Sequence, residues 1–426
     1  MIAHDALPRL LYGAGEQPRS LREHEEVFAP VTVRPDGLVA ELAAAGVTGH
    51  GGAGFPTHRK VELLRTQRGH RKFMVVNAME GEPASHKDLS LINANPHLVL
   101  DGAEMLAAAI GARHVAVCVE RDNPTTVNAM KRAIHERSRR SQRGPEFELH
   151  TPPWRYVAGE ESALVHWLND NESLPQYRPQ RPSILRVGHG PALVDNAETC
   201  AHVALVARYG AAWFRGLGTE QSPGSTLVSV TGAVARPTVL EVALGTRIST
   251  ILSAAGADPE PQALLLGGYG GMWLSGQHVD APYANESLKP LGAAVGAGVM
   301  LVIPRGACGL SEVHRITKWM AHESARQCGP CAFGLPAITE DLAQLVTGGR
   351  DPERAYQRLV ERLGVINGRG ACAHPDGVVR MVRSALEVFV TDIEHHRRGS
   401  ACAGSRSGTH YATVPALERE EDLVWQ

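Results

Sequence analysis

The stretch Gly49-His50-Gly51-Gly52-Ala53-Gly54-Phe55-Pro56-Thr57, followed by Lys60, decides how this chain is interpreted. Its closely spaced glycines let the backbone turn sharply and present bare N–H groups, with no Cβ in the way. A helix after such a loop adds partial positive charge at its N-terminus, and Lys60 adds a full charge. The loop therefore predicts a cradle for the phosphate of a nucleotide or a flavin.

The spacing of this loop does not match the common nucleotide-binding motifs. It is Gly-x-Gly-Gly-x-Gly rather than Gly-x-Gly-x-x-Gly, and no Gly-Lys-Ser/Thr closes it as in a Walker loop. A glycine-rich surface turn would look the same in isolation. The choice between a phosphate cradle and a surface turn therefore depends on the rest of the chain.

Composition indicates a soluble globular protein of several domains. The chain has 426 residues, a net charge of −2 and 43% hydrophobic residues, with no apolar run long enough to span a bilayer and no signal-peptide core at its start. The small charge argues against a nucleic-acid-binding surface. Seven cysteines in a chain of this length indicate metal or redox chemistry in a reducing compartment, so we expect a cytoplasmic protein.

Alternating short strands and helices predict an α/β region in the first half of the chain, with a partly parallel sheet. Helices are expected over 38–45, 98–110, 125–139 and 194–213, and strands over 72–77 and 114–120. Short strands and glycine turns then predict a small β-rich unit, and a helical pattern continues from Leu310 to His396. The polar tail from Gly399 onward is expected to be loosely ordered.

Cys328-Gly329-Pro330-Cys331 places two thiols on one turn, where they can bind one metal ion or cluster, and Cys372 follows later in the chain. The pair is compatible with an iron–sulfur cluster, with zinc or with structural cysteines, and we favour the cluster. A thioredoxin-type dithiol is disfavoured because no strand–helix context surrounds the pair. Zinc would require a fourth ligand, for which the candidates are Cys308, Cys402 and His374.

Two further blocks place acids where an α/β fold binds ligands. Asn77-Ala78-Met79-Glu80-Gly81-Glu82-Pro83 starts at the end of an expected strand, and strand ends form the ligand-binding edge of a parallel sheet. Tyr156-Val157-Ala158-Gly159-Glu160-Glu161-Ser162-Ala163 is a turn with two acids that opens a helix. Acids also suit a first helical turn without any ligand, so ordinary helix capping is an alternative for this block.

In this order the blocks resemble the flavin-containing NADH-dehydrogenase subunit of respiratory complex I and its diaphorase relatives in hydrogenases and formate dehydrogenases. That family carries Gly-Arg-Gly-Gly-Ala-Gly-Phe-Pro-Thr, Asn-x-Asp-Glu-x-Glu-Pro, Tyr-x-x-Gly-Glu-Glu-Thr-Ala and Asn-Asn-Val-Glu-Thr blocks, a β-grasp domain and a cysteine motif. The matching blocks here run from Gly49 to Cys372. An ion-pumping ferredoxin–NAD oxidoreductase component shares the glycine loop, but it ends in two ferredoxin-like cysteine runs that this sequence lacks.

The resemblance implies FMN, NADH and a 4Fe–4S cluster as cofactors. Residues at the family's FMN-binding positions are Gly49, Gly51, Gly52, Lys60, Asn77, Glu80, Tyr156, Gly159, Glu160 and Asn196. Phe55 matches an aromatic residue that stacks on the nicotinamide nucleotide in relatives. Glu82 and Glu161 match acids near the dinucleotide and are the expected catalytic residues.

The cluster motif departs from the family at one ligand. Cys328, Cys331 and Cys372 match three cluster thiolates, but Ala325 stands where the first cysteine of the family motif would be. A 4Fe–4S cluster normally takes four ligands. For the fourth we expect Cys402 or Cys308, with Ser324 or a non-protein group as alternatives. A three-iron cluster or no cluster is also compatible with this motif.

Departures around the flavin concern charge and stacking. His50 replaces the arginine of the loop, Met79 replaces an acid, and Asp195 replaces the first asparagine of the Asn-Asn pair. Leu63 and Ile184 stand where relatives usually offer aromatic rings to the adenine. Each lost stacking partner removes about 0.5–1.5 kcal/mol, so we expect NADH to bind weakly.

We therefore expect an α/β fold with a Rossmann-like flavin-binding domain, a β-grasp domain and a C-terminal helical bundle. The expected boundaries are 1–35 for an N-terminal extension, 36–223 for the FMN/NADH domain, 224–305 for the β-grasp domain, 306–398 for the helical cluster domain and 399–426 for the tail. The expected function is electron transfer from NADH through FMN and the cluster to a ferredoxin or small iron–sulfur partner subunit. The alternative is a flavoprotein without NADH turnover that serves in assembly or as an electron conduit.

Overall fold

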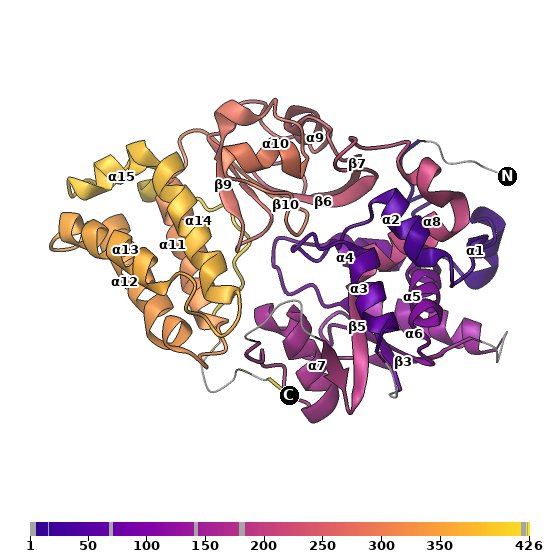
Figure 1. The fold of residues 1–426 in the computed structure, drawn as a ribbon. Coiled ribbons are helices and arrows are strands. Elements are labelled where there is room, and N and C mark those ends of the chain that lie inside the picture. Colours follow the sequence, from indigo (N-terminus) through magenta and orange to yellow (C-terminus); the bar gives the residue numbers. More distant parts are fainter. Residues whose placement is uncertain are drawn as a thin grey trace.

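The computed structural model describes residues 6–15, 17–67, 71–139, 144–178, 184–418, 423 and 425–426, so the extension expected at 1–35 and the tail expected at 399–426 lie partly outside the described residues. An α/β part, a mixed sheet and a helical part follow one another along the chain and surround a common centre (Figure 1). Within the described ranges, no helix has the length and apolarity that crossing a membrane requires.

The first part is built on a five-stranded sheet in the order β3-β2-β1-β5-β4. Its strands are β1 (Phe73–Ala78), β2 (His114–Val119), β3 (Glu146–His150), β4 (Leu185–Val187) and β5 (Gly190–Asn196). Strands β3, β2, β1 and β5 run parallel, and β4 closes one edge antiparallel. The predicted Rossmann-like α/β fold is confirmed. Asn77 pairs in register with Asn196, so β1 and β5 present these two amides at the same carboxyl edge.

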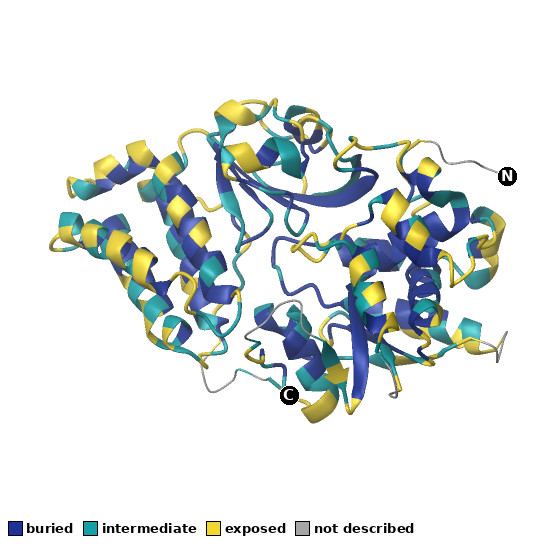
Figure 2. Ribbon diagram, viewed as in Figure 1, coloured by how far each residue is buried: buried dark blue, intermediate teal, exposed yellow. Residues whose placement is uncertain are grey.

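Helices cover both faces of this sheet. They are α1 (Leu21–Val27), α2 (Leu38–Ala45), α3 (Thr57–Arg65), α4 (Lys87–Ala94), α5 (Pro96–Ile110), α6 (Pro124–Ser138), α7 (Glu161–Asp170) and α8 (Ala197–Phe214). Side chains alternate along a strand, so Met74 and Val76 of β1 pack toward α5 and α8, while Val75 packs toward α7. Burial on both faces explains why the central strands are apolar along their length (Figure 2).

The second part is a five-stranded mixed sheet in the order β7-β6-β10-β8-β9. Its elements are β6 (Ser225–Gly232), β7 (Thr238–Ala243), α9 (Ile248–Ala254), β8 (Ala263–Leu266), β9 (Met272–Ser275), α10 (Asn285–Leu288) and β10 (Val299–Ile303). The central strands β6 and β10 are parallel, and the outer pairs are antiparallel. One face packs on α9 through Ile251 and Leu252, as a β-grasp arrangement requires. The other face packs through Leu265 and Trp273 on the helical part.

The helical part consists of α11 (Gly309–His322), α12 (Leu335–Thr347), α13 (Pro352–Ile366), α14 (His374–Val388), α15 (Val390–Arg397) and α16 (Ala403–Ser407). A π-helical turn, Pro330–Gly334, precedes α12 and contains Cys331. The predicted C-terminal helical bundle is therefore confirmed.

Two local expectations are wrong. Residues 194–196 belong to strand β5, and α8 begins only at Ala197 because the Asn196 side chain caps it, accepting from the Glu198 N–H at 3.0 Å. The described part of the tail is also not loosely ordered. The Glu312 carboxylate of α11 accepts from the N–H groups of Tyr411 and Ala412 at 3.1 and 3.0 Å, which holds this segment against the helix.

Candidate functional site

The three parts meet at two adjoining cavities of about 540 and 510 Å³. Both are lined by Gly51, Asn77, Gly159, Glu160, Asn196 and Ala373. The larger cavity also contacts the second sheet at Gly267 and the helical part at Cys372. Cavities of this size suit a cofactor or substrate, and the carboxyl edge of a Rossmann-like sheet is where nucleotides bind.

Every residue predicted to bind flavin or dinucleotide lies in the wall of one of these cavities. Those in the larger cavity are Gly51, Gly52, Asn77, Glu80, Glu82, Tyr156, Gly159, Glu160 and Asn196. Those in the smaller cavity are Gly49, Gly51, Phe55, Lys60, Asn77, Gly159, Glu160, Glu161 and Asn196. The fold therefore gathers segments far apart in the sequence into one site, and the individual roles of these residues stay predictions.

The glycine loop offers unused backbone donors to these cavities. Gly52 and Gly54 have φ angles of 105° and 62°, which residues with a Cβ rarely adopt. Gly51 and Gly52 are exposed, and in the described part of the chain their N–H groups donate to no protein acceptor. The loop leads into α3, which begins at Thr57. Free N–H groups ahead of a helix N-terminus fit the phosphate of FMN.

Lys60 is already paired with carboxylates. Its Nζ lies 2.7 Å from Oε1 of Glu161 and 3.3 Å from Oδ1 of Asp195, and it donates to the Val194 carbonyl at 3.0 Å. Burial alone would lower the pKa of Lys60, but the Asp195 and Glu161 carboxylates outweigh it and hold the pKa above its usual value. The charge of Lys60 is therefore partly neutralised within the protein, and Asp195, one of the sequence departures, contributes to this.

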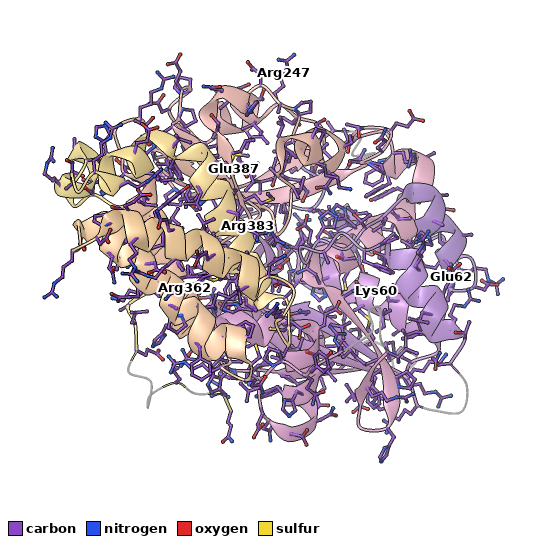
Figure 3. The ribbon with its side chains drawn as sticks, turned by 60° about the vertical axis from the view of Figure 1, so that its left-hand side comes forward. Lys60, Glu62, Arg247, Arg362, Arg383 and Glu387 are labelled. Carbon is purple, nitrogen blue, oxygen red and sulfur yellow. The ribbon has the colours of Figure 1, made fainter. Side chains whose placement is uncertain are left out.

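We expect Asp195→Asn to strengthen FMN binding about three- to thirtyfold, because it removes a buried negative charge that competes with the flavin phosphate for Lys60. The dissociation constant can be measured by quenching of flavin fluorescence on titration into the flavin-free protein. Glu62→Gln is the matched control, since Glu62 is an exposed acid two residues from Lys60 on α3 (Figure 3). Unchanged or weaker FMN binding by Asp195→Asn would show that Asp195 does not compete with the flavin phosphate for Lys60.

A buried charge network anchors the glycine loop. His50 Nδ1 lies 2.9 Å from Oε1 of Glu198, and Lys87 Nζ lies 2.9 Å from Oε2 of the same carboxylate. Burial opposes ionisation of Glu198, but His50 and Lys87 outweigh it and hold its pKa well below the usual value. The His50 N–H also donates to Oγ1 of Thr199 at 2.9 Å. The histidine that replaces the family arginine thus ties the loop to the start of α8.

The Glu80 carboxylate is used by the protein itself. It accepts from the N–H groups of Lys87 at 2.7 Å, Asp88 at 3.2 Å and Leu89 at 3.0 Å, and so caps the first turn of α4. Burial, reinforced by the neighbouring Asp88, raises the pKa of Glu80 to about 7. Glu80 therefore holds α4 in place at the cavity, in addition to any contact with a ligand.

Glu82 and Tyr156 connect the cavity to the other two parts. Glu82 accepts from the Tyr269 N–H of the second sheet region at 2.7 Å, and burial raises the pKa of Glu82 to about 7. A carboxyl with this pKa can both hold and release a proton at neutral pH. The Tyr156 ring packs edge-on against Trp319 of α11 and His374 of α14, with centroids 5.5 and 5.4 Å away.

Glu160 performs ordinary helix capping as well as lining both cavities. Its Oε2 accepts from the Ser162 N–H at 2.8 Å at the start of α7, which is the alternative that the sequence left open. Its Oε1 lies 2.9 Å from Nη2 of Arg178. Arg178 lies in the wall of the smaller cavity, on a proline-rich crossing where no pattern marked it.

The two positions expected to stack on the adenine contain aliphatic side chains. Phe55 and Leu63 line the smaller cavity, whereas Ile184 packs against the core of the first part and its neighbour Leu185 lines the cavity instead. Phe55 is therefore the one aromatic side chain among the described residues of this wall. This arrangement agrees with the expectation of weak dinucleotide stacking.

The three predicted cluster thiols come together in the helical part. The Cys331 side chain interacts with Cys328 and Cys372, and burial together with these two thiols raises its pKa above the usual value. Ser324, whose hydroxyl donates to the Ala321 carbonyl at 2.9 Å, lies beside the Cys331 thiol. Three convergent thiols from a turn and a distant loop fit an iron–sulfur cluster in which the fourth iron has no cysteine ligand. Cys372 also lies in the wall of the larger cavity, so the thiol site borders the flavin site.

The prediction that Cys402 or Cys308 supplies the fourth cluster ligand is wrong. Cys308 caps the N-terminus of α11, whereas Ser324 follows the opposite end of that helix. A helix of this length separates its ends by about 20 Å. Cys402 lies beside Cys308 and shares its location. Among the sequence candidates, Ser324 alone is at the cluster thiols.

Sequence reasoning overlooked three charged residues of the site, Lys87, Glu198 and Arg178. Lys87 resembles an exposed residue at a helix start, and burial becomes visible only once the fold is known. Glu198 could have been found from the sequence, because it occupies the acid position of the family's Asn-Asn-Val-Glu-Thr block.

The fold and the site together define an electron-transfer flavoprotein with a cluster-binding helical part. Residues 42–205 match the family model of the Nuo51 FMN-binding domain. Residues 311–396 match the NADH-ubiquinone oxidoreductase-F iron-sulfur binding region. The chain is 30% identical to the F subunit of NADH-quinone oxidoreductase from Mycobacterium tuberculosis, covering 89% of each protein. It belongs to the family of these NADH-quinone oxidoreductase F subunits.

Other relatives agree with this assignment. The F subunit of the Streptomyces coelicolor enzyme is 29% identical, with 89% of this chain and 87% of the relative covered. A solved NAD+-reducing [NiFe]-hydrogenase in the H2-reduced state superimposes with a TM-score of 0.77 and 28% identity, covering 85% of this chain. The chain spans 63% of that hydrogenase chain. The predictions of family, of an FMN-binding domain, of a 4Fe–4S binding region and of an NADH dehydrogenase-type oxidoreductase are confirmed.

Proposed function

We propose that this protein oxidises NADH at a bound FMN and passes the electrons one at a time through the cluster to a partner. Bound FMN would provide the redox chemistry, because a flavin can accept a hydride and release electrons one at a time. The chain's own contribution is to hold the flavin with backbone donors of the glycine loop and to hold a proton at Glu82.

One observation carries this proposal: Cys372 lies in the wall of the cavity that contains the glycine loop. It belongs to the group of thiols that includes Cys331, so a flavin in this cavity would border a cluster ligand. A short distance between flavin and cluster serves electron transfer, and a dehydrogenase that passes no electrons to a cluster would not need it. Tyr156 lines the cavity and packs against His374, and so lies between the two centres.

The expected partner is a ferredoxin or a small iron–sulfur protein of the same assembly. The relatives carry the word subunit in their names, which supports function within an assembly. Phe333 is 77% exposed and lies two residues after Cys331, so an apolar contact point is present where electrons would leave. The seven cysteines are all free thiols, as in a reducing compartment, which supports the proposed cytoplasmic location.

NADH is expected to bleach the bound flavin in an anaerobic stopped-flow trace, with weak apparent affinity because the smaller cavity has aliphatic walls. The Leu63→Phe variant restores an aromatic ring in that wall and should lower the concentration of NADH needed for half-maximal bleaching by about three- to tenfold. If neither NADH nor NADPH bleaches the flavin, the alternative of a conduit or assembly protein replaces the proposal.

A further inference from the structure

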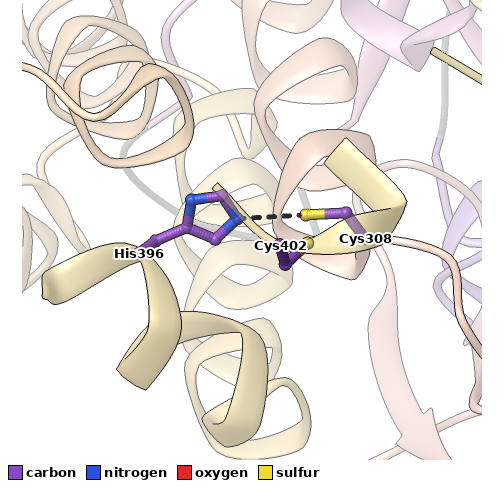
Figure 4. Close-up of side chains that lie close together, drawn as sticks. All are labelled: Cys308, His396 and Cys402. Atoms are coloured by element: carbon purple, nitrogen blue, oxygen red, sulfur yellow. Dashed lines mark hydrogen bonds between the residues drawn. The ribbon is translucent and has the colours of Figure 1, made fainter. Parts of the chain in front are cut away.

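Cys308, His396 and Cys402 form a second group of potential metal ligands in the helical part. Their ligand atoms all lie within 4.8 Å of one another, and Nε2 of His396 lies 3.4 Å from Sγ of Cys308 (Figure 4). The three side chains come from separate segments: the N-terminus of α11, the last turn of α15 and the start of α16. We propose that they bind a zinc ion that fastens the C-terminal tail to the helical part.

The donor set selects zinc. Two thiols and an imidazole are soft and borderline donors that suit Zn²⁺, whereas Mg²⁺ and Ca²⁺ require oxygen ligands. Binding releases one proton from each thiol, and His396 binds as the neutral imidazole. The resulting site of two thiolates and a divalent ion has no net charge. A water molecule completes the usual four ligands of zinc.

A catalytic Cys–His pair explains these residues less well. Cys308 is 4% exposed and His396 is fully buried, so a substrate has no access to the pair. Cys402 is partly exposed and provides the side from which an ion can enter.

Backbone N–H groups support both sulfurs. Sγ of Cys308 accepts from the Ser311 N–H and Sγ of Cys402 accepts from the Ser405 N–H, each at 3.3 Å. Such outer contacts stabilise the negative charge of metal-bound thiolates. On α15, Asp392 lies one turn before His396 and accepts from the Gly309 N–H at 2.9 Å, which fixes the start of α11 next to the group.

The tail packs too closely on this group to be an incidental neighbour. A Cβ placed on Gly404 would lie 2.4 Å from the backbone nitrogen of Cys308, so the two backbones are in direct contact. Farther along, the Thr413 carbonyl accepts from the Tyr269 hydroxyl at 2.5 Å. The Tyr269 N–H in turn donates to Glu82 in the larger cavity. The fastened tail therefore reaches a residue beside the flavin site.

Metal analysis of the reconstituted full-length protein tests the proposal. Wild type dialysed against Zn²⁺ and then against buffer should retain about one zinc per chain in addition to iron. In Cys402→Ser, a substitution on the partly exposed tail, the zinc content per chain should be about tenfold lower than in wild type, and the iron content should be unchanged. Cys331→Ser is the reciprocal control and should lose iron while keeping zinc. Zinc at trace levels in wild type, equal zinc in Cys402→Ser, or loss of zinc in Cys331→Ser would each overturn the proposal.

Two further measurements test which atoms bind the zinc ion and whether the ion holds the C-terminal tail in place. X-ray absorption at the zinc edge should show two sulfurs at about 2.3 Å and a nitrogen at about 2.0–2.1 Å, whereas a shell of oxygen alone would exclude this site. Trypsin should cut at Arg406 about fivefold or more faster in Cys402→Ser and in wild type treated with a zinc chelator than in untreated wild type. A cleavage rate that zinc removal leaves unchanged would show that the ion does not fasten the tail.

Discussion

Gly52→Val is expected to reduce the FMN released on denaturation from about one per chain to less than about a tenth, because it removes the backbone geometry of the cradle. Gly52 has a φ of 105°, where a β-branched residue is strained by about 1–3 kcal/mol. Its Cβ would lie 3.9 Å from the backbone nitrogen of Ala297, a residue of the larger cavity, so the valine methyl groups would occupy space that the flavin needs.

The control for this prediction is Gly111→Val. Gly111 also has a positive φ, 77°, at the end of α5, and apart from its chain neighbours no described atom lies within 4 Å of a Cβ built there. It lines neither cavity, so this variant carries similar backbone strain and should keep its flavin. The flavin should have the chromatographic mobility of FMN. Release of FAD alone from wild type, or full flavin content in Gly52→Val, would contradict the assigned cradle.

Cys331→Ser should abolish the iron–sulfur signal in low-temperature spin resonance, because this buried thiol lies near the other two predicted cluster cysteines. Bleaching of the flavin by NADH should remain near the wild-type rate. Electron delivery to a ferredoxin should fall by about tenfold or more, since the one-electron exit is missing. Iron content, spin resonance and ferredoxin reduction should be measured anaerobically on the same preparation. Together with flavin bleaching, these measurements separate reduction of the flavin by NADH from electron delivery to the ferredoxin.

Cys118→Ala provides the matched control for the cluster. Cys118 is a buried cysteine of β2 with a pKa raised by burial, and it packs in the layer formed by Val75 and Leu164. Its replacement should leave the iron content unchanged.

The wild-type cluster should also be more sensitive to oxygen than a four-cysteine site, because one iron lacks a thiolate. Trace iron in freshly reconstituted wild type would show that the thiol site no longer holds a cluster.

The sequence predicted the fold and the composition of the site well because local signals were strong. The apolar strands 72–77 and 114–120 match β1 and β2 within one residue, since residues buried on both faces of a parallel sheet must be apolar. The helix limits near Gly46 and Gly111 were equally clear, because both glycines adopt the left-handed conformation that ends a helix. The ordered family blocks then selected the residues that line the two cavities.

The partners of the charged residues could not be predicted in the same way. The pairing of Lys60 with Asp195 joins α3 to the end of β5, and the contact of His50 with Glu198 joins the loop to α8. Helical and strand periodicity predicts that a residue is buried or exposed, but it does not specify which distant charge will face it. These contacts depend on how the elements pack, and they decide how much positive charge remains for the flavin.

By itself, the sequence determined the order of the elements, the glycine loop and the spacing of the cluster cysteines, because local backbone geometry and short spacings along a chain set these features. Only the tertiary structure decided how the remaining cysteines are distributed. Helix α11 places Cys308 at its start and the cluster thiols beyond its end, while the tail brings Cys402 back to Cys308 and His396. Distance along the chain does not fix distance in space, so the cysteines predicted to serve one cluster lie in two separate groups.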